Sequence, residues 1–505
     1  ACHNQSYIQK YDIVQECKPG GTFLLNCIWN EEELERHLPN RVKRYMACNH
    51  IHFYTINAVK IGKEIGLGNR TNAALQSAFF KLANVIPFED AVVYMKEAIL
   101  KSYGKKGEKV VNMNYEAVDR GAEELTLVQV PQEWADLPDE EKKEDASLPE
   151  FVRKLMNPVN DLKGDLLPVS AFAGREDGTV PLGTSQYEKR GTAVDVPEWN
   201  KDKCLQCNQC SYVCPHGAIR PFLLDQKEME QAPEGYGYEK AKGRGMEEYG
   251  YRMQVSPLDC LGCGACVQVC PAKEKALVMK PLESQEKENA NWNYSMSLSK
   301  KKNPLGKYSV KGSQFETPLL EFSGACAGCG ETPYAKLMTQ MFGDRMIIAN
   351  ATGCTQAWGA AFPCVPYTVN EKGYGPAFSN SLFENNAEFC LGMSLSITQQ
   401  RERLAAGLKK LQELGVSQKL ETAVNAWFEA YDDGDRTMEV TQQLVEALSE
   451  EALEGQKAQL KEEILTHKEH LSKKSLWMYG GDGWAYDIGF GGLDHVLASG
   501  QDVNI

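Results

Sequence analysis

The chain has 505 residues, more than one hydrophobic core usually supports, so its length predicts about three domains. Hydrophobic residues make up 42% and charged residues 25%, which is ordinary for a globular protein, and no apolar run approaches the ~20 residues that cross a bilayer. The net charge of −14 argues against nucleic acid as a partner, and the first residues lack the pattern of a signal peptide, so we expect a cytoplasmic protein without a membrane segment.

The first part of the chain alternates between predicted strands and helices. Residues 23–29 form a short apolar run that ends before Asn30, which predicts a buried strand followed by a helix N-cap. The next expected elements are a strand over residues 51–57 and three helices, over residues 58–66, 71–86 and 91–103. Such alternation favours a parallel sheet covered by helices, so we expect an α/β domain over residues 1–135.

The rest of the chain is expected to contain two linkers and two further domains. Residues 136–195 are acidic and rich in Pro, Gly and Asp, which predicts a linker. Residues 196–283 contain a cysteine repeat, interrupted by a charged stretch over residues 225–252 that we interpret as a surface loop. Residues 284–316 are expected to form a second linker, and residues 317–505 a last α/β domain. Within that domain we expect two strands, over residues 345–351 and 475–479, and a long helical stretch between them, over residues 396–474.

Eight of the seventeen cysteines form a repeated motif. Residues 204–215 read C-x-x-C-x-x-C-x-x-x-C-P, and residues 260–271 repeat this spacing. In such a run three thiolates wrap one iron–sulfur cubane, and the fourth ligates its neighbour. The spacing therefore predicts two [4Fe-4S] clusters, one held by Cys204, Cys207, Cys210 and Cys270, the other by Cys260, Cys263, Cys266 and Cys214. A pair of zinc ribbons is the alternative, although these usually show two C-x-x-C pairs with a long spacer.

A third cysteine group follows the repeat. Cys326 and Cys329 form another C-x-x-C, and Cys354 lies at the end of a predicted strand. We expect a third [4Fe-4S] cluster here, for which the spacing nominates no fourth ligand, and a mononuclear zinc site is the alternative. The other six cysteines are interpreted as small buried hydrophobes: Cys2, Cys17, Cys27, Cys48, Cys364 and Cys390.

A glycine-rich turn lies near the end of the chain. Gly481, Asp482 and Gly483 follow a predicted strand, and Trp484 opens a predicted helix that runs to Leu497. Glycines at a strand–helix turn let backbone N–H groups bind phosphate oxygens, and an aspartate there can bind Mg²⁺. The motif therefore indicates a diphosphate site, with an ordinary glycine-rich turn as the alternative.

Taken together, these residues resemble the C-terminal half of the pyruvate:ferredoxin (flavodoxin) oxidoreductases, over essentially the whole chain. The resemblance implies a γ-type α/β domain associated with coenzyme A, a ferredoxin-like domain with two [4Fe-4S] clusters, and a thiamine-diphosphate-binding α/β domain. It is carried by the cysteine repeat and by residues 23–26, 68–72, 79–84, 103–109, 324–334, 351–354 and 481–484.

The family also implies roles for single residues. Cys326, Cys329 and Cys354 would ligate the cluster nearest thiamine diphosphate, and Glu331 and Cys354 would lie beside that cofactor. Residues 481–484 would line its diphosphate, with Asp482 on Mg²⁺. Asn72 and Arg120 are candidate contacts for coenzyme A.

The activity that the family implies is pyruvate synthase chemistry in anaerobic metabolism. Pyruvate and coenzyme A would become acetyl-CoA and CO₂, and electrons would pass from thiamine diphosphate through three [4Fe-4S] clusters to ferredoxin or flavodoxin. The expected partners include the remaining domains of the same enzyme and a second copy in a homodimer. Because the family's chains are much longer, we expect an inactive fragment, truncated at both ends and lacking a ligand of the third cluster. The alternatives are another 2-oxoacid oxidoreductase and a non-catalytic polyferredoxin-type electron carrier.

Overall fold

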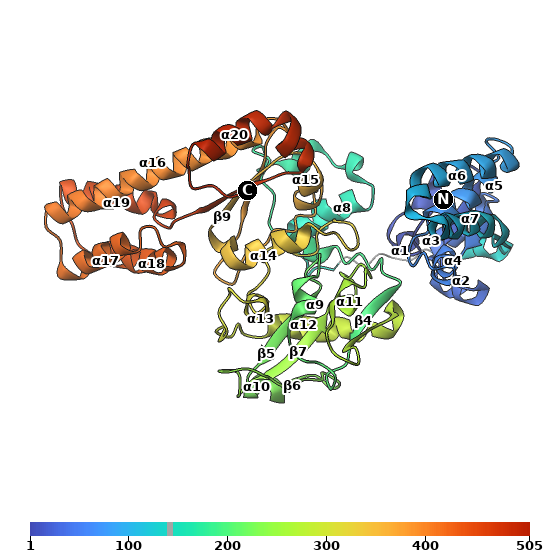
Figure 1. Ribbon diagram of the computed structural model, residues 1–505, viewed down its shortest axis with the longest axis horizontal. Helices are drawn as coiled ribbons and strands as arrows, with labels where there is room; N and C mark the ends of the chain where they lie inside the picture. Colours follow the sequence, from blue (N-terminus) through green and yellow to red (C-terminus); the bar gives the residue numbers. More distant parts are fainter. Residues whose placement is uncertain (139–144) are drawn as a thin grey trace. The chain divides into compact units, whose positions relative to one another are not determined.

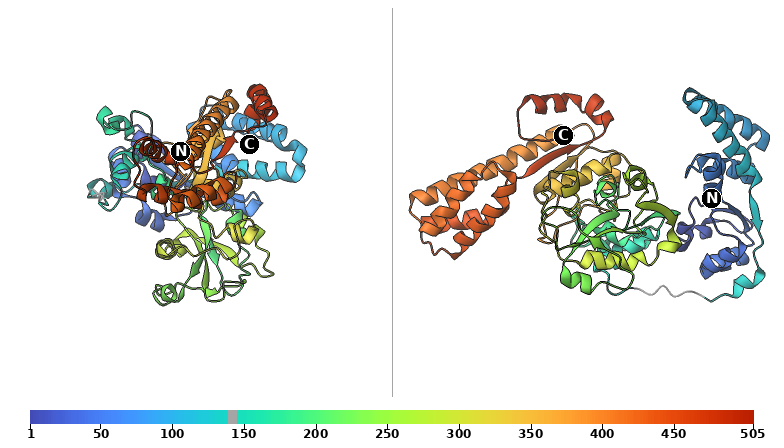
Figure 2. Two further views of the ribbon diagram at one scale, coloured as in Figure 1. Left: turned by 90° about the vertical axis from the view of Figure 1, so that its left-hand side faces the viewer. Right: turned by 60° about the horizontal axis from the view of Figure 1, so that its bottom comes forward.

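The computed structural model describes residues 1–138 and 145–505, which form two compact units, Ala1–Ala173 (unit 1) and Gly174–Ile505 (unit 2) (Figures 1 and 2). Both units combine helices and strands, so the predicted mixed α/β multidomain fold is confirmed. Of the linker expected at residues 136–195, residues 139–144 lie outside the described residues. No described helix is long and apolar enough to span a membrane.

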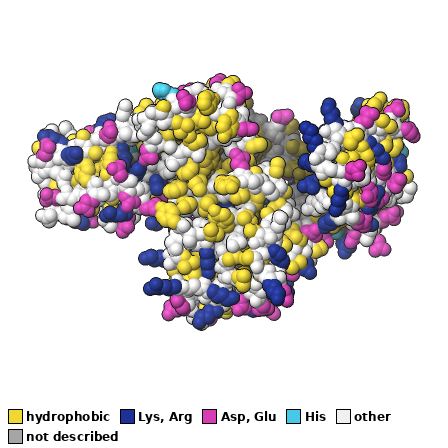
Figure 3. Space-filling model, viewed as in Figure 1, with side chains coloured by type: hydrophobic (Ala, Val, Ile, Leu, Met, Phe, Trp, Pro, Cys, Tyr) yellow, Lys and Arg dark blue, Asp and Glu magenta, His cyan; other side chains and the backbone are white. Residues whose placement is uncertain are grey.

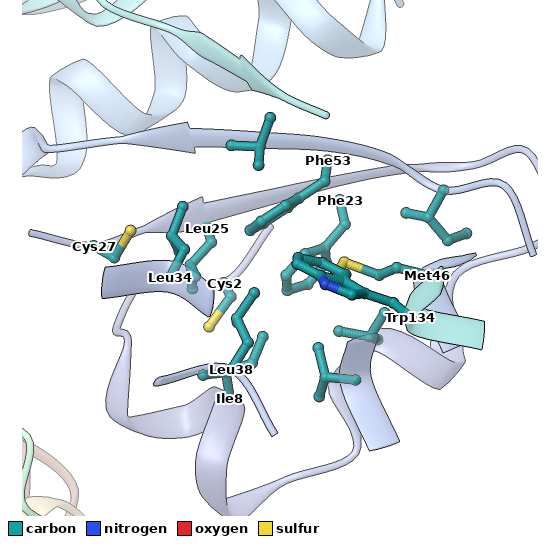
Figure 4. Packing of buried hydrophobic residues seen from close by; sticks show 14 of the residues in the cluster. Cys2, Ile8, Phe23, Leu25, Cys27, Leu34, Leu38, Met46, Phe53 and Trp134 are labelled. Carbon is teal, nitrogen blue, oxygen red and sulfur yellow. The ribbon is translucent and has the colours of Figure 1, made fainter. Parts of the chain in front are cut away.

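Unit 1 is built on a three-stranded sheet with the order β1-β2-β3. β1 (Thr22–Asn26) and β2 (His52–Ile56) pair in parallel, and β3 (Thr126–Val128) runs antiparallel to β2. Phe23 and Leu25 of β1 enter the hydrophobic cluster on one face, while Leu24 enters the cluster on the other, because side chains alternate along a strand. In Figure 4, Phe23, Leu25 and Phe53 of the two strands lie together with Leu34, Met46 and Trp134.

Two helices of unit 1 begin or end as the sequence predicts. α2 (Glu31–His37) follows Asn30, which forms a capping box with Glu33. α4 (Ala58–Ile65) ends at Gly66, whose backbone is left-handed. The other helices of unit 1 are α1 (Ser6–Lys10), α3 (Asn40–Cys48), α5 (Asn72–Ala83), α6 (Phe88–Tyr103), α7 (Glu108–Glu123) and α8 (Asn157–Asn160).

The helices α3 and α7 and the antiparallel strand β3 were not predicted from the sequence. β3 has only three residues, too few to show a period, so the expected parallel pairing holds for β1 and β2 but not for β3. α7 crosses α5 at very close range: a Cβ atom on Gly121 would lie 2.3 Å from the carbonyl oxygen of Ala74. Glycine is therefore needed at this crossing.

The cysteine repeat of unit 2 folds around two antiparallel strand pairs. The first pair is β4 (Asp195–Trp199) with β8 (Leu277–Pro281), and the second is β5 (Ile219–Leu224) with β7 (Gly250–Val255). A short strand β6 (Glu239–Lys240) extends the second sheet. The helices in this part are α9 (Gln209–Tyr212), α10 (Gln226–Glu230) and α11 (Ala265–Val269).

Two interpretations of this part were wrong. Residues 225–252 are not simply a surface loop, because β7 is buried along its length and Met246 and Tyr251 are core residues. The linker expected at residues 284–316 contains the helices α12 (Glu288–Ser297) and α13 (Val310–Ser313), and Trp292 of α12 is buried. Both segments contain only a few large buried side chains among many charged and polar residues, so their sequences show no clear hydrophobic period.

The last part of unit 2 is a parallel sheet with the order β10-β9-β11. Its strands are β9 (Met346–Asn350), β10 (Ala377–Asn380) and β11 (Ser475–Tyr479), which confirms the two predicted strands. Two helices, α14 (Thr332–Phe342) and α15 (Cys354–Gly359), precede and follow β9. A π-helical turn over Trp484–Ile488 and α20 (Phe490–Ala498) follow β11 in place of the single predicted helix.

Four long helices between β10 and β11 lie side by side and have a core of their own (Figure 1). The break predicted near residues 432–435 is confirmed, because the helix α18 begins at Gly434 and is capped by the Asp433 side chain. These helices are α16 (Asn386–Glu413), α17 (Gln418–Glu429), α18 (Gly434–Glu450) and α19 (Gln456–Thr466).

Candidate metal and cofactor sites

The first set of repeat cysteines surrounds one cavity of unit 2, here called the first cavity. It contains about 350 Å³ of empty space, part of it open to solvent, and its walls include Trp199, Tyr251 and Leu277. Trp199 ends β4 opposite Leu277, where β8 begins, so the loop after β4 and the segment before β8 emerge side by side. The cysteines that line this cavity are Cys204, Cys207 and Cys210 of the first motif and Cys270 of the second.

The second set surrounds an equivalent cavity, the second cavity, which contains about 400 Å³ of empty space, part of it open to solvent. Here Ile219 begins β5 opposite Val255, where β7 ends, so the chain before β5 and the chain after β7 meet. The cysteines that line it are Cys260, Cys263 and Cys266 of the second motif and Cys214 of the first. Each antiparallel pair therefore brings three cysteines of one motif to the last cysteine of the other.

The donor set of each cavity fits a multi-iron cluster. Among the described residues, no three His, Cys, Asp or Glu side chains converge as ligands of a single metal ion would. The four sulfur atoms of each set line a volume instead, and thiolates are the ligands of [4Fe-4S] clusters.

The thiols of both cavities are buried. Burial raises the pKa of Cys260 to about 12 and raises the pKa of Cys210 and of Cys266 further above the usual range. Without iron these groups hold their protons at neutral pH, so loading a cluster must release protons.

Backbone N–H groups reach sulfur in both motifs. Those of Gln206 and Gly262 donate to Cys204 Sγ and Cys260 Sγ, each at 3.4 Å. Gly262 has a φ of +67°, and a Cβ there would lie 2.7 Å from the carbonyl oxygen of Asp195, so the loop needs glycine at this position. Such hydrogen bonds to sulfur help to set a cluster's potential.

The third cysteine group approaches the second cavity, which the sequence analysis did not foresee. The loop that holds Cys326 and Cys329 precedes α14, and a Cβ atom on its Gly328 would lie 3.5 Å from the Cβ atom of Cys263. His216 lines the second cavity, and its two ring nitrogens lie 3.2 Å from the Ser323 carbonyl oxygen and 3.3 Å from that of Cys326. Burial lowers the pKa of His216 to about 4, so the ring is neutral.

The three residues Glu188, Lys189 and Arg190 tie the second cavity to this third loop. The Lys189 ammonium lies 2.5 Å from the buried Asp259 carboxylate, next to Cys260. Arg190 pairs with Glu188 at 2.5 Å and donates to the Ser323 carbonyl oxygen at 2.8 Å. A segment that the sequence analysis treated as linker therefore holds two cysteine loops in place.

Replacing Lys189 by methionine is expected to lower the free energy of unfolding by about 1–3 kcal/mol, because Asp259 stays buried without its cation. Anaerobic urea unfolding measures the change. The matched control is Lys154→Met, which removes an ammonium from an exposed pair with Glu150 and should change stability by less than about 1 kcal/mol. Equal effects of the two variants would contradict the prediction.

The parallel sheet of unit 2 brings two other predicted segments together. Asn350 at the end of β9 pairs with Tyr479 at the end of β11, so the loops that hold Cys354 and Asp482 leave the same sheet edge. In open parallel sheets ligands bind at the carboxyl ends of the strands. The buried Asn386 amide joins both strands by donating to the Tyr479 carbonyl oxygen at 3.1 Å and to that of Ala349 at 3.4 Å.

Glu331 lies close to the helix of Cys354. It precedes α14, and its carboxylate accepts a hydrogen bond at 3.3 Å from the indole of Trp358 in α15, the helix that Cys354 begins. Nearby, the buried Asn350 Oδ1 and Tyr479 hydroxyl find no hydrogen-bond partner among the described residues. Orphaned polar atoms at this edge fit a polar ligand.

The glycine-rich turn divides into an exposed part and a buried part. Gly481, Asp482 and Gly483 are exposed, and the Asp482 carboxylate accepts from the Gly483 N–H at 3.0 Å. The Trp484 side chain is only 1% exposed, and Cβ atoms on Gly480 and Gly489 would lie 2.4 and 2.2 Å from its ring. The indole thus belongs to the core, and Trp484 as a whole is buried, unlike the three residues of the turn before it.

The coenzyme A candidates lie in unit 1, on two helices that pack together. Asn72 is the exposed first residue of α5, and Arg120 lies in α7 beside Gly121, where the helices cross. The Arg120 guanidinium is 2.6 Å from each of the carboxylates of Glu64 and Glu124, and these hydrogen bonds raise its pKa further. A ligand would have to compete with those carboxylates.

The six scattered cysteines differ in burial. Cys2, Cys27, Cys364 and Cys390 are buried, as interpreted, and Cys17 is half-buried. Cys48 is exposed, so the interpretation was wrong there, because the last turn of α3 turns this side chain outward. All seventeen cysteines lie in the described part of the chain, and none of them forms a disulfide.

Two interleaved cysteine sets of this kind define a protein with a pair of iron–sulfur clusters, and residues 203–274 match the family model described as a 4Fe-4S dicluster domain. Residues 1–124 match the model of pyruvate ferredoxin/flavodoxin oxidoreductase, and residues 138–193 match EKR, a domain of unknown function. The chain belongs to the pyruvate:ferredoxin/flavodoxin oxidoreductase family.

Three relatives support this assignment over the whole chain. The pyruvate-flavodoxin oxidoreductase of Klebsiella pneumoniae is 52% identical over 505 residues, and the pyruvate:ferredoxin oxidoreductase of Moorella thermoacetica is 52% identical over 508 residues. A mitochondrial pyruvate dehydrogenase [NADP(+)] of Euglena gracilis is 44% identical over 511 residues. The chain spans 43% of the length of each of the first two relatives and 28% of the third.

Proposed function

We propose that these residues serve an oxidoreductase that converts pyruvate and coenzyme A to acetyl-CoA and CO₂ and passes two electrons to ferredoxin or flavodoxin. The observation that carries the proposal is the combination, within unit 2, of two interleaved cysteine cavities and a parallel sheet whose carboxyl edge presents Asp482 and the Cys354 helix. The printed names of the relatives support the substrate and the acceptor.

The cysteines would hold the electron carriers. We propose one [4Fe-4S] cluster in the first cavity and one in the second, each a one-electron site. A third cluster would involve Cys326, Cys329 and Cys354. The contact between Gly328 and Cys263 supports an order in which the third cluster passes electrons to the second cavity.

The carboxyl edge of the parallel sheet would bind the cofactor. Thiamine diphosphate, when bound, supplies the carbanion that attacks the 2-oxo carbon and accepts the electron pair left by decarboxylation. Asp482 would bind Mg²⁺, the exposed turn of residues 481–483 would line the diphosphate, and Glu331 would lie beside the cofactor. Asn72 and Arg120 remain proposed contacts for coenzyme A, and a homodimer remains the proposed assembly.

The activity is tested in the full-length protein that carries these residues, purified without oxygen. We expect it to reduce ferredoxin or a viologen dye only when both pyruvate and coenzyme A are present. Asp482→Asn removes a charged Mg²⁺ ligand and should weaken thiamine diphosphate binding at least about tenfold, as measured by isothermal titration. Asp487→Asn, an exposed aspartate one turn later, is the matched control and should bind normally.

Other outcomes would change the proposal. Reduction of the dye by another 2-oxoacid but not by pyruvate would keep the chemistry and replace the substrate. Correctly loaded clusters, with no oxoacid-dependent reduction and no binding of thiamine diphosphate, would reject the proposed enzymatic activity. The alternative function, a non-catalytic electron carrier, would then be favoured.

A further inference from the structure

α14 buries a polar face. Its buried residues recur at the spacing of one helix face, and four of the five are polar. They are Thr332, Ala335, Lys336, Thr339 and Gln340. A buried polar face needs partners on the element that it packs against, and here that element is the loop between Cys210 and Cys214.

Side-chain contacts hold this face against the cysteine loop. Ser211 Oγ donates to Gln314 Oε1 at 2.9 Å, and the Gln314 amide donates to Gln340 Oε1 at 3.1 Å. Lys336 donates directly to the carbonyl oxygen of Ser211. The helix that follows the third cysteine group is thus fastened to the loop that joins the first two cavities.

Lys336 is a buried cation without a carboxylate partner. It is 1% exposed, and its ammonium forms no ion pair among the described residues. The neighbouring guanidinium of Arg220 is already neutralised by Glu321, with both side chains 7% exposed. Burial lowers the pKa of Lys336 to about 8, which shows how unfavourable an ammonium is here when only protein atoms surround it.

Clusters held by the two cysteine sets would supply the missing negative charge. Ser211 stands directly after Cys210, which lines the first cavity, and three residues before Cys214, which lines the second. A cubane on four thiolates carries net negative charge and gains one more when it is reduced, so a buried cation beside it favours the reduced state.

We propose that Lys336 is a positioning residue that acts through its charge: its buried ammonium raises the reduction potentials of both ferredoxin-type clusters. The proposal rests on the clusters assigned above. The proposal gives α14 a second role besides following the loop of Cys326 and Cys329: the helix influences which cluster holds an arriving electron.

The test uses the anaerobically purified intact chain with Lys336→Met and Lys336→Gln. The midpoint potential of each cluster is followed by electron paramagnetic resonance during a reductive titration, and iron per chain is measured in parallel. Both variants should shift the ratio of reduced to oxidised cluster about tenfold toward oxidised, a potential about 59 mV more negative. Lys336→Gln keeps a donor for the Ser211 carbonyl oxygen, so its shift reports charge and not the lost hydrogen bond.

Two controls define the expected pattern. Lys336→Arg keeps the charge and should keep the potentials near those of the unchanged chain. Lys242→Met removes an exposed ammonium that also donates to a carbonyl oxygen of a cysteine loop, that of Cys204 at 3.3 Å, and should shift the potential far less because water screens it.

Three outcomes would overturn the proposal. If Lys336→Gln keeps its full iron content and its ratio of reduced to oxidised cluster stays within twofold of that of the unchanged chain, the charge does not act on the clusters. Loss of iron from both neutral variants would give Lys336 a role in assembly instead. A shift in Lys336→Arg equal to that of Lys336→Gln would show that shape rather than charge matters. Absence of iron from the unchanged chain would instead refute the clusters themselves, which keeps the two failures apart.

Discussion

Replacement of Cys270 by alanine is expected to remove the cluster bound by the other motif and to spare the cluster of its own motif. Cys270 lines the first cavity with Cys204, Cys207 and Cys210, whereas the three cysteines that precede it line the second. A cubane in the first cavity would lack one of its four thiolates, so we expect about four irons per chain to be lost. Iron and acid-labile sulfide, measured without oxygen, give the result.

Double variants make this result specific. Cys204→Ala combined with Cys270→Ala should lose no more iron than either single variant, because both residues line one cavity. Cys263→Ala combined with Cys270→Ala should lose about eight irons, because these residues line different cavities. The opposite pattern, with additivity between Cys204 and Cys270, would mean that each motif holds its own metal.

Replacement of Arg220 by methionine is expected to be the most destabilising charge change in unit 2. Arg220 and Glu321 form an ion pair with both side chains 7% exposed, and the guanidinium also lies over the rings of Trp292 and Phe322. Without it the Glu321 carboxylate stays buried and unpaired, which should lower the free energy of unfolding by about 3–5 kcal/mol in anaerobic urea denaturation.

The paired replacement is the decisive comparison. Arg220→Met with Glu321→Leu removes both charges and should regain most of the lost stability. Arg403→Met breaks an exposed pair with Glu463 at 2.6 Å and should lower stability by less than about 1 kcal/mol. A double variant as unstable as Arg220→Met would show that the pair itself, and not the orphaned carboxylate, determines stability.

The sequence predicted those elements whose signals are local. Asn30 and Gly66 mark helix ends by their own side chain or backbone, and the apolar run at β1 is buried on both faces. α12 and β7 were missed because their burial depends on distant partners: Trp292 packs on Phe222 and Phe322, and Tyr251 packs on Trp199. Such contacts with distant residues produce no hydrophobic period in the sequence of the segment itself.

The same distinction applies to the sites. The cysteine spacing is local, and the two cavities collect the cysteines in the sets that it predicts, although cluster binding itself stays a prediction. His216, Lys189 and Lys336 could not be found, because each acts on residues 70 to 125 positions away. A lone lysine within a helical pattern is typical of a solvated face, and only the fold shows that this one is buried.

The buried contacts of α14 have a consequence for transport within unit 2. One rigid helix links the loop of Cys326 and Cys329 to the loop of Cys210 and Cys214, through Lys336, Gln340 and their partners. If the proposed clusters occupy these loops, their separation is fixed by folding and does not depend on a diffusional encounter. In the proposed enzyme, solvent viscosity should then affect only the arrival of substrate and of the external acceptor, and not the electron transfer between the clusters.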